Sequence, residues 1–204
     1  MVIGTRRSGR NYCGRFAPSP TGELHLGSLV AALASYLQAR ARGGHWLVRV
    51  EDIDPPREVQ GSAQSILNSL ENLGLTADGI DYQSQRTERY DKRLAQLRRC
   101  GLAYGCGCSR KNLTPAGRYP GYCRHGMPPG STERSIRLRV PPVPIRFDDG
   151  LRGRQSWNLA RDSGDFVIRR ADGLYAYQLA AAVDDAEQGM TEVVRGTDLL
   201  GSTP

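Results

Sequence analysis

A sharp turn between a short strand and a long helix is the feature that most constrains this chain. Residues 12–17 (YCGRFA) resemble a strand and lead into PSPTG at 18–22, where two prolines and a glycine interrupt regular structure. Apolar residues then recur at three- and four-residue spacing over 25–42, and the glycine pair at 43–44 ends this helical pattern. The segment 45–52 (HWLVRVED) follows as a compact strand. Strand, helix and strand form a βαβ unit, so we expect an α/β fold with a parallel sheet.

The character of the chain changes near residue 100. Apolar spacing predicts two further helices, at 58–73 and 87–100. Gly, Pro, Cys and Arg then dominate 101–144, which indicates a small inserted module. Strand character returns at 135–140 and at 192–200. Residues 165–180 predict a strand, an Asp-Gly turn and then a second strand or a helix start, which suits a β-hairpin.

The overall composition is that of a globular protein. Hydrophobic residues make up 39% and charged residues 24% of the 204 residues. Apolar patches such as 29–37 are shorter than the ~20 residues that a membrane-spanning helix needs. The basic residues near the N-terminus, Arg6, Arg7 and Arg10, are not followed by the apolar core of an export signal. We therefore expect a cytoplasmic protein without a membrane partner.

Positive charge is concentrated in one part of the chain. The net charge is +7, but residues 98–161 alone contain thirteen Lys or Arg and three acids, a local charge of +10. A basic face of this kind suits a polyanion such as RNA, because binding releases counterions from the phosphates. A solvated, arginine-rich surface explains the charge equally well.

The turn and helix start have a chemical use. Backbone amides and the helix dipole at HLGS (25–28) favour phosphate oxygens. Gly27 removes a side chain where a flat base could lie, and the imidazole of His25 can donate to a phosphate as charge develops. Taken alone, one His and two glycines near a helix start are more often structural.

The longer string is far more specific. RFAPSPTGELHLGS (15–28) resembles the first signature of class I aminoacyl-tRNA synthetases of the glutamate type, with Ser28 in place of a second His. RVEDIDPPR (49–57), YQLAAAVDD (177–185) and VVRGTDLL (193–200) match later segments of that family in the same order. The resemblance extends from Cys13 to Pro204 and implies a Rossmann-type parallel-sheet nucleotide-binding domain with an inserted zinc-binding α+β module.

The resemblance also implies roles for individual residues. In it, His25 and Gly27 bind ATP, which carries Mg²⁺. Arg15 pairs with the carboxylate of bound L-glutamate, and Glu51 holds the α-amino group, as a guanidinium fork and a carboxylate are suited to do. The remaining residues implied in glutamate binding are Phe16, Ala17, Pro18, Ser19, Tyr177 and Arg195. Without the surrounding strings, an ordinary salt bridge is the better interpretation of Glu51 and Arg195.

Three of the five cysteines form a metal-binding pattern. Cys106, Cys108 and Cys123 lie in a loop without apolar periodicity, where a tetrahedral zinc ion would hold a small module together. His125 is the fourth ligand that general chemistry nominates. The pattern also resembles the zinc site of the glutamyl-queuosine tRNA(Asp) branch of the family, which makes Tyr119 the ligand, and this is our prediction. The two other cysteines, Cys13 and Cys100, are expected to be buried.

The family resemblance implies an enzyme that activates L-glutamate with ATP as glutamyl-adenylate. The Tyr-x3-Cys arrangement and the DPPRE string (54–58) favour transfer to the queuosine base in the anticodon of tRNA(Asp). One alternative is a standard glutamyl-tRNA synthetase that charges the 3′ end of tRNA. A second is a non-catalytic, zinc-stapled RNA-binding module. We expect a monomer.

The order of segments predicts three parts. Residues 1–100 form the first half of the nucleotide-binding domain, 101–160 the inserted zinc-binding acceptor-end module, and 161–204 a truncated continuation toward the second half. The lysine-bearing second signature of class I synthetases is absent from these 204 residues. GSTP (201–204) has the cap and proline of a helix start, which favours a fragment over a frayed tail. In a fragment, the lysine motif would lie beyond Pro204.

Overall fold

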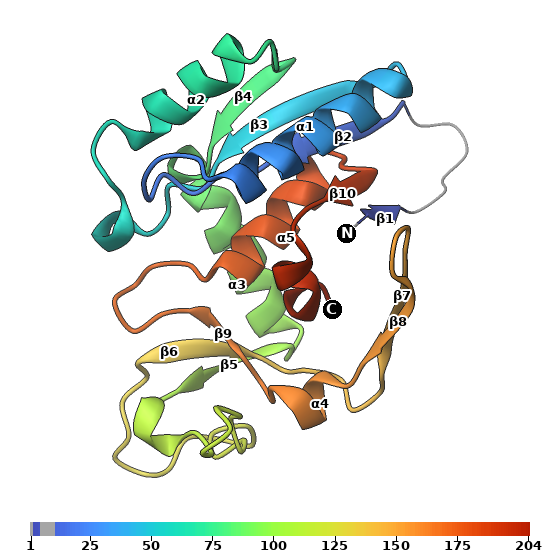
Figure 1. The fold of residues 1–204 in the computed structure, drawn as a ribbon. Coiled ribbons are helices and arrows are strands. Elements are labelled where there is room, and N and C mark those ends of the chain that lie inside the picture. The colour runs from blue at the N-terminus through green and yellow to red at the C-terminus, as the bar shows by residue number, and fades with distance from the viewer. Residues whose placement is uncertain (1, 5–10) are drawn as a thin grey trace. The chain divides into compact units, whose positions relative to one another are not determined.

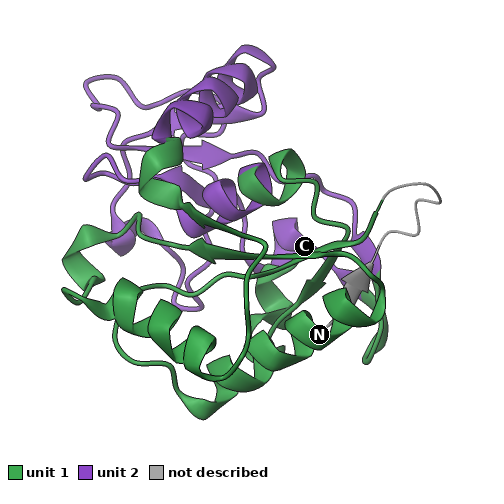
Figure 2. Ribbon diagram, turned by 90° about the horizontal axis from the view of Figure 1, so that it is seen from above, with its two compact units in different colours: residues 1–86, 148–155, 184–203 green, residues 87–147, 156–183, 204 purple. Residues whose placement is uncertain are grey.

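The fold was analysed in a computed structural model that describes residues 2–4 and 11–204 (Figure 1). The basic N-terminal residues Arg6, Arg7 and Arg10 lie outside the described residues. The chain divides into two compact units, each built from separate stretches of sequence (Figure 2). The first unit comprises residues 1–86, 148–155 and 184–203, and the second comprises 87–147, 156–183 and 204. The three-part division predicted from the sequence stays a prediction.

A parallel sheet forms the centre of the first unit. Its strands are β2 (Cys13–Phe16), β3 (His45–Val50) and β4 (Gly79–Tyr82), in that order. Both neighbouring pairs are parallel, with Cys13 opposite His45. The helix α1 (Leu26–Ala41) connects β2 to β3, and α2 (Ser62–Asn72) precedes β4 (Figure 1). The predicted βαβ unit and its parallel sheet are confirmed.

The helix α1 packs on the sheet through small residues. Its buried side chains are Ala32, Ser35 and Ala39, and the indole of Trp46 on β3 donates to the Ser35 hydroxyl at 2.9 Å. Small side chains let the helix approach the sheet closely enough for this contact. The larger apolar side chains that reveal the helix in the sequence are instead exposed: Leu26 76%, Val30 58%, Leu33 46% and Leu37 55%.

A second sheet joins segments from both ends of the described chain. Its strand order is β10-β1-β7-β8, and β1 (Val2–Gly4) runs antiparallel to both neighbours. The other members are β7 (Ile145–Asp149), β8 (Gly153–Trp157) and β10 (Glu192–Val194), which is followed by the 3₁₀ helix η4 (Thr197–Ser202). The strands β7 and β8 were not predicted from the sequence.

An antiparallel sheet forms the centre of the second unit. The strands are β5 (Ala103–Cys106), β6 (Ser135–Leu138) and β9 (Val167–Arg169), with β6 in the middle. The helix α3 (Thr87–Arg99) buries Tyr90 and Leu94, as its apolar spacing predicts. Short helices occupy Leu159–Asp162 (α4) and Arg110–Asn112 (η3).

The predicted hairpin is short. After β9, Gly173 adopts a positive φ of 84° in the turn, and a single bridge joins Arg169 to Tyr175. The chain then enters α5 (Tyr177–Glu187), so of the two predicted continuations, strand or helix start, the structure has the helix. Two 3₁₀ turns, η1 (Pro55–Arg57) and η2 (Gln83–Arg86), complete the elements. Within the described residues, every helix is too short or too polar to cross a membrane.

Candidate active site and metal centre

The turn that follows β2 is fixed by hydrogen bonds to two other elements. The amide of Glu51, directly after β3, donates to the carbonyl oxygen of Pro18 at 2.8 Å. The amide of Val59 donates to the carbonyl of Pro20 at 2.9 Å, and the Ser62 hydroxyl at the start of α2 donates to the carbonyl of Gly22 at 2.6 Å. Prolines have no amide hydrogen, so they contribute acceptors only. The turn therefore holds its shape through contacts with β3 and α2.

His25 caps the helix that leaves this turn. Its Nδ1 accepts the amide hydrogen of Ser28 at 3.2 Å, and its Nε2 lies 3.1 Å from the Ser28 hydroxyl. Because Nδ1 is an acceptor, the neutral ring carries its proton on Nε2. The ring lies against Gly27, where an added Cβ would be only 3.0 Å from its Cε1 atom. A side chain at position 27 would therefore crowd the imidazole, a reason for glycine that differs from the flat base expected from the sequence.

A buried ion-pair cluster joins the strands β2 and β3 to Asp185. The Nε and Nη2 atoms of Arg15, on β2, donate to the two carboxylate oxygens of Asp185 at 3.1 and 3.2 Å. Arg49, on β3, donates to Asp185 at 2.7 Å and to Gln188 at 2.8 Å. Burial raises the pKa of Asp185, but the two guanidinium groups outweigh it and hold that pKa below its ordinary value. Asp185 therefore holds the guanidinium of Arg15 by its Nε and Nη2 atoms, and Nη1 takes no part in this ion pair.

Glu51 is a buried carboxyl group beside this cluster. Its Oε1 atom lies 3.5 Å from Nη2 of Arg49, and within the described part of the chain it accepts no hydrogen bond. Burial raises the pKa of Glu51 to about 7, although Arg49 and Arg15 both lower it. A buried carboxylate oxygen that accepts no hydrogen bond suits a cationic group with several N–H donors, such as an ammonium group.

The remaining predicted glutamate residues differ in their surroundings. Phe16 packs in the hydrophobic core of the first unit, Ala17 is half-buried and Ser19 is exposed. Arg195 follows β10 and donates through Nη2 to the hydroxyl of Thr203. Tyr177 is the first residue of α5 and belongs to the second unit.

Sequence reasoning missed the charged residues that support Arg15. Arg49 is fully buried within β3, and Asp184 accepts from the side chains of Gln83 at 2.7 Å and Arg86 at 2.6 Å. One signal was available, because an arginine between the buried apolar positions of a parallel strand needs a buried acid. The adjacent acids that end YQLAAAVDD supply it.

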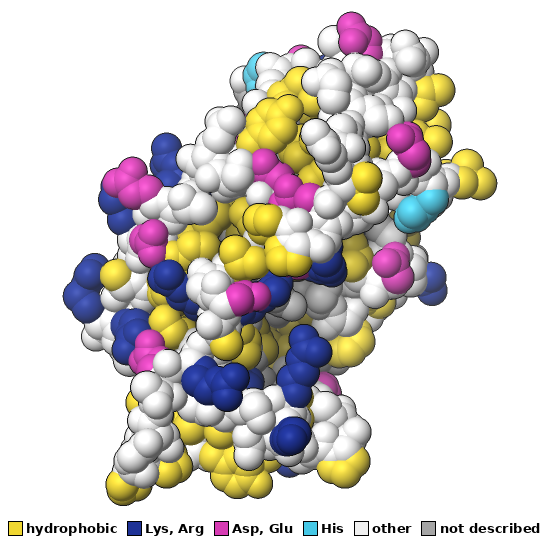
Figure 3. Space-filling model, turned by 90° about the vertical axis from the view of Figure 1, so that its left-hand side faces the viewer, with side chains coloured by type: hydrophobic (Ala, Val, Ile, Leu, Met, Phe, Trp, Pro, Cys, Tyr) yellow, Lys and Arg dark blue, Asp and Glu magenta, His cyan; other side chains and the backbone are white. Residues whose placement is uncertain are grey.

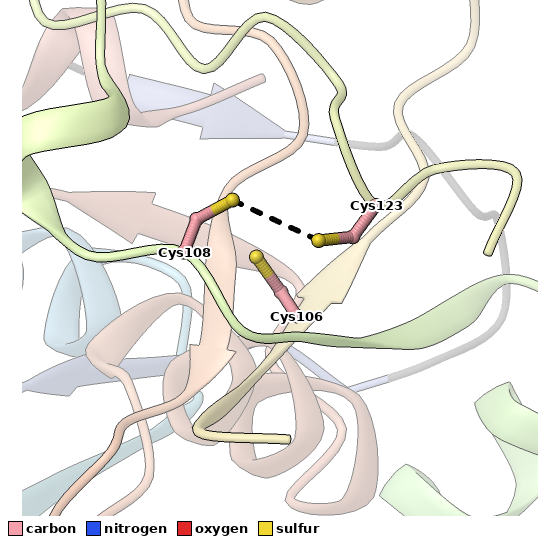
Figure 4. Close-up of side chains that lie close together, drawn as sticks. All are labelled: Cys106, Cys108 and Cys123. Carbon is pink, nitrogen blue, oxygen red and sulfur yellow. Dashed lines mark hydrogen bonds between the residues drawn. The ribbon is translucent and has the colours of Figure 1, made fainter. Parts of the chain in front are cut away.

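In the second unit, three cysteine sulfurs point toward one another (Figure 4). The Sγ atoms of Cys106, Cys108 and Cys123 all lie within 4.8 Å of one another, and those of Cys108 and Cys123 are 3.7 Å apart. Tetrahedral zinc with Zn–S bonds of about 2.3 Å needs sulfurs about 3.8 Å apart. The cluster therefore has the dimensions of a zinc site.

The hydroxyl of Tyr119 completes this group. It lies 3.4 Å from the sulfur of Cys106 and 3.7 Å from that of Cys108, and it accepts the amide hydrogen of Cys123 at 2.9 Å. His125 is exposed and is not among the described His, Cys, Asp or Glu residues that join the cluster. The structure thus brings Tyr119, and not His125, to the three sulfurs.

The cysteine environments are unequal. Burial raises the pKa of Cys106, but hydrogen bonding with Tyr119 and Arg137 outweighs it and brings that pKa to about 7. Burial and the neighbouring Cys123 raise the pKa of Cys108 to about 11. Of these two sulfurs, Cys106 is therefore the one more readily present as the thiolate that metals bind.

The two other cysteines do not match the expectation of burial. Cys100 is exposed, and Cys13 is only half-buried. Cys100 directly follows α3 and lies outside the helix that buries Tyr90 and Leu94.

Many basic side chains of the arginine-rich segment are on the surface. Figure 3 shows several Lys and Arg side chains close to one another on the face that it draws. The exposed ones in residues 98–161 are Arg98, Arg99, Arg110, Lys111, Arg134, Arg146, Arg152, Arg154 and Arg161. Arg118, Arg124 and Arg139 are partly buried, and Arg137 is buried at 6% exposure beside the cysteine cluster.

Comparisons with known proteins agree with these features. The family described as tRNA synthetases class I (E and Q), catalytic domain, matches residues 13–118 and 126–204. A glutamyl-Q tRNA(Asp) synthetase from Pseudomonas aeruginosa is 57% identical over 196 residues, which cover 95% of this chain and 67% of that protein. One from Dechloromonas aromatica is 55% identical over 203 residues.

Solved structures give the same answer for the fold. A glutamate tRNA ligase from Elizabethkingia meningosepticum, in complex with its amino acid, superposes with a TM-score of 0.85 at 30% identity. The match covers 95% of this chain and 45% of that one, so the chain spans less than half of this structural relative. The family resemblance inferred from RFAPSPTGELHLGS is confirmed. The chain belongs to the class I tRNA synthetases for glutamate and glutamine, and its matched residues are part of their catalytic domain.

Proposed function

We propose that this chain is the catalytic part of a glutamyl-Q tRNA(Asp) synthetase. Such an enzyme would activate L-glutamate with ATP and transfer it to the queuosine base in the anticodon of tRNA(Asp). The observation that carries the proposal is the placement of Arg15 and Glu51 beside the turn that leads to His25. The buried cation of Arg15 suits a carboxylate of an amino acid, and the buried acid of Glu51 suits its ammonium group. The adjacent start of α1 suits phosphate.

Glutamate recognition is derived from the ion-pair cluster. Asp185 holds Arg15 by its Nε and Nη2 atoms, so the edge that carries Nη1 is oriented for a substrate carboxylate. Glu51 receives the α-ammonium group, whose charge favours the ionised carboxylate that burial disfavours. Phe16, Ala17, Pro18, Ser19 and Arg195 complete the proposed glutamate pocket of the first unit, and a role for Tyr177 stays a prediction from the family resemblance.

Adenylate formation is assigned to the turn and the start of α1. A glutamate carboxylate oxygen attacks the α-phosphorus of ATP, a new P–O bond forms, and the bond to pyrophosphate breaks. The Nε2–H of His25 can donate to a phosphate oxygen as charge develops, and its orientation is fixed by Ser28 and Gly27. Mg²⁺ bound with ATP supplies further charge balance.

The cysteine cluster is proposed to hold structural zinc. Cys106, Cys108 and Cys123 would provide three thiolates and Tyr119 the fourth ligand, and the bound ion would stabilise the module around β5 and β6. The general family match omits residues 119–125, which contain both Tyr119 and Cys123. The match to the family model therefore covers Cys106 and Cys108 but not the other two proposed ligands.

A standard glutamyl-tRNA synthetase is the alternative that one observation favours. The superposition on a glutamate tRNA ligase at a TM-score of 0.85 covers nearly the whole chain. Both enzymes share glutamate activation and differ in the acceptor, so the acceptor is what the experiment must distinguish.

Glutamate-dependent exchange of pyrophosphate into ATP tests the first step. We expect the full-length protein to catalyse exchange without any tRNA. Transfer of labelled glutamate is then compared on queuosine-containing tRNA(Asp), unmodified tRNA(Asp) and tRNA(Glu). Labelling of only the queuosine-containing tRNA supports the proposal, and labelling of tRNA(Glu) supports the alternative. Absence of exchange with and without tRNA would favour the non-catalytic RNA-binding module.

A further inference from the structure

Arg137 contacts two members of the proposed metal centre with one side chain. Its Nε donates to the sulfur of Cys106 at 3.3 Å. Its guanidinium carbon lies 3.7 Å from the centre of the Tyr119 ring, and its Nη1 donates to the main-chain oxygen of Asp165 at 2.7 Å. The side chain is therefore held at three points, and two of them are candidate metal ligands.

The sheet register explains how Arg137 reaches the cluster. On the central strand β6 it pairs with Tyr104 of β5, and Cys106 lies two residues further along β5. Residues two apart on a strand share a face, and a diagonal neighbour is within reach of a long side chain. The contact between Arg137 and Cys106 therefore follows from strand pairing and not from a flexible loop.

The contact between Arg137 and Cys106 also affects the charge balance of the proposed metal centre. Arg137 is buried, yet among the described residues its hydrogen bonds go to a sulfur and a main-chain carbonyl, and no carboxylate forms an ion pair with it. A buried cation needs an opposite charge nearby. Three thiolates exceed the charge of Zn²⁺ and would supply that negative charge.

We propose that Arg137 is a positioning residue of the metal centre, which orients Cys106 and Tyr119 for coordination and balances the excess negative charge of the loaded site. This inference rests on the metal site proposed above. The stacked guanidinium keeps the Tyr119 ring from turning its hydroxyl away from the sulfurs. Groups that contact metal ligands in this way commonly change metal affinity by about 10–100-fold.

Arg139 provides a matched control. Its guanidinium lies 4.7 Å from the centre of the Tyr104 ring in the same unit, and none of its described contacts is with Cys106, Cys108 or Cys123. Arg139→Met removes the same charge and an aromatic contact without touching the cluster.

Zinc affinity of the full-length protein is measured by competition with a chromogenic chelator. We expect Arg137→Met to bind zinc about 10–100-fold more weakly than wild type and Arg139→Met to be unchanged. Arg137→Lys keeps the charge but loses the planar stack, so we expect an intermediate loss. Substitution with Co²⁺ adds a spectroscopic readout, because the sulfur-to-cobalt absorption band should shift in Arg137→Met and not in Arg139→Met.

Two outcomes separate this inference from the metal site itself. Stoichiometric zinc in wild type with unchanged affinity and cobalt spectrum in Arg137→Met would overturn the role of Arg137. Failure of wild type to bind zinc would overturn the metal site. If Arg137→Met does not fold in excess zinc, the comparison of Arg137→Lys with Arg139→Lys decides, and equal affinities would refute the proposal.

Discussion

At the scale of single residues, Glu51 is a carboxyl group that folding removes from water. Burial raises its pKa to about 7 from an ordinary value of 4.5. Between these two values the folded protein binds a proton that the unfolded protein does not, so the contribution of Glu51 to stability falls as pH rises through this window. Above pH 7, the ionised and buried carboxylate costs on the order of 1–3 kcal/mol.

Replacing Glu51 should therefore stabilise the ligand-free protein in a pH-dependent way. We expect Glu51→Gln to raise the free energy of unfolding at pH 8 by about 1–3 kcal/mol and to change it much less at pH 5. Urea unfolding at both pH values measures this, with the exposed Glu71→Gln as control. An equal effect of Glu51→Gln at the two pH values would contradict the raised pKa.

Asp185 is shared by two buried guanidinium groups. Asp185→Asn leaves Arg15 and Arg49 close together without their common counter-charge. We expect a loss of about 3–5 kcal/mol in the free energy of unfolding. Glutamate affinity, measured by calorimetry, should fall because Arg15 is no longer held by one edge. Glu88→Gln, which breaks an exposed pair with Lys92, is the control and should change neither quantity. Wild-type glutamate affinity in Asp185→Asn would refute the positioning role.

The fourth metal ligand can be tested directly. Tyr119→Phe removes a hydroxyl 3.4 Å from the Cys106 sulfur, whereas His125 is exposed and outside the cluster. We expect Tyr119→Phe to weaken zinc binding about tenfold or more and His125→Ala to leave it unchanged. Zinc retention after dialysis against a chelator measures both variants. The reverse order would show that imidazole is the ligand.

The sequence predicted individual residues unevenly. It nominated Arg15, Glu51 and three cysteines as site residues because strings and spacings single them out. It did not identify Asp185, Arg49 or Arg137, whose partners lie far away in the sequence. A charged residue within a strand shows that a partner is needed but does not show which residue supplies it.

At the scale of elements, the two faces of α1 should respond oppositely to substitution. Ala32 is fully buried against the sheet, so Ala32→Leu adds volume where none is available and should cost about 1–3 kcal/mol. Leu33 is 46% exposed, and Leu33→Gln should change stability by no more than about 0.5 kcal/mol. Thermal unfolding of both variants measures this. A larger loss of stability in Leu33→Gln than in Ala32→Leu would mean that Leu33, and not Ala32, lies on the face of α1 that packs against the protein.

Helical and parallel-sheet elements were predictable because their signals are local. The 3.6-residue period predicted α1 and α3, and the proline turn predicted the βαβ unit. The strands β7 and β8 were missed, since IRFDD and GRQSW carry little apolar alternation. The pairing of β7 with β1, more than 140 residues away in the sequence, leaves no local pattern, and β8 joins the sheet only through β7.

At the scale of the whole molecule, both compact units are assembled from separate stretches of chain. Composition indicated a change near residue 100 but could not predict that residues 148–155 and 184–203 return to the first unit. Such a return depends on pairing between distant strands and on buried ion pairs such as that of Arg15 with Asp185. These contacts depend on the three-dimensional fold and have no periodic signature.

The tethered turn at Pro18 to Gly22 has a consequence for the energetics of recognition. Its carbonyls are already bonded to the amides of Glu51 and Val59, so its conformational entropy is lost during folding and not when a ligand arrives. Hydrogen exchange can show this, because both amides should exchange slowly in protein without ligand, and saturating glutamate should protect them little further. Rapid exchange that glutamate suppresses would instead describe a loop that orders only on binding.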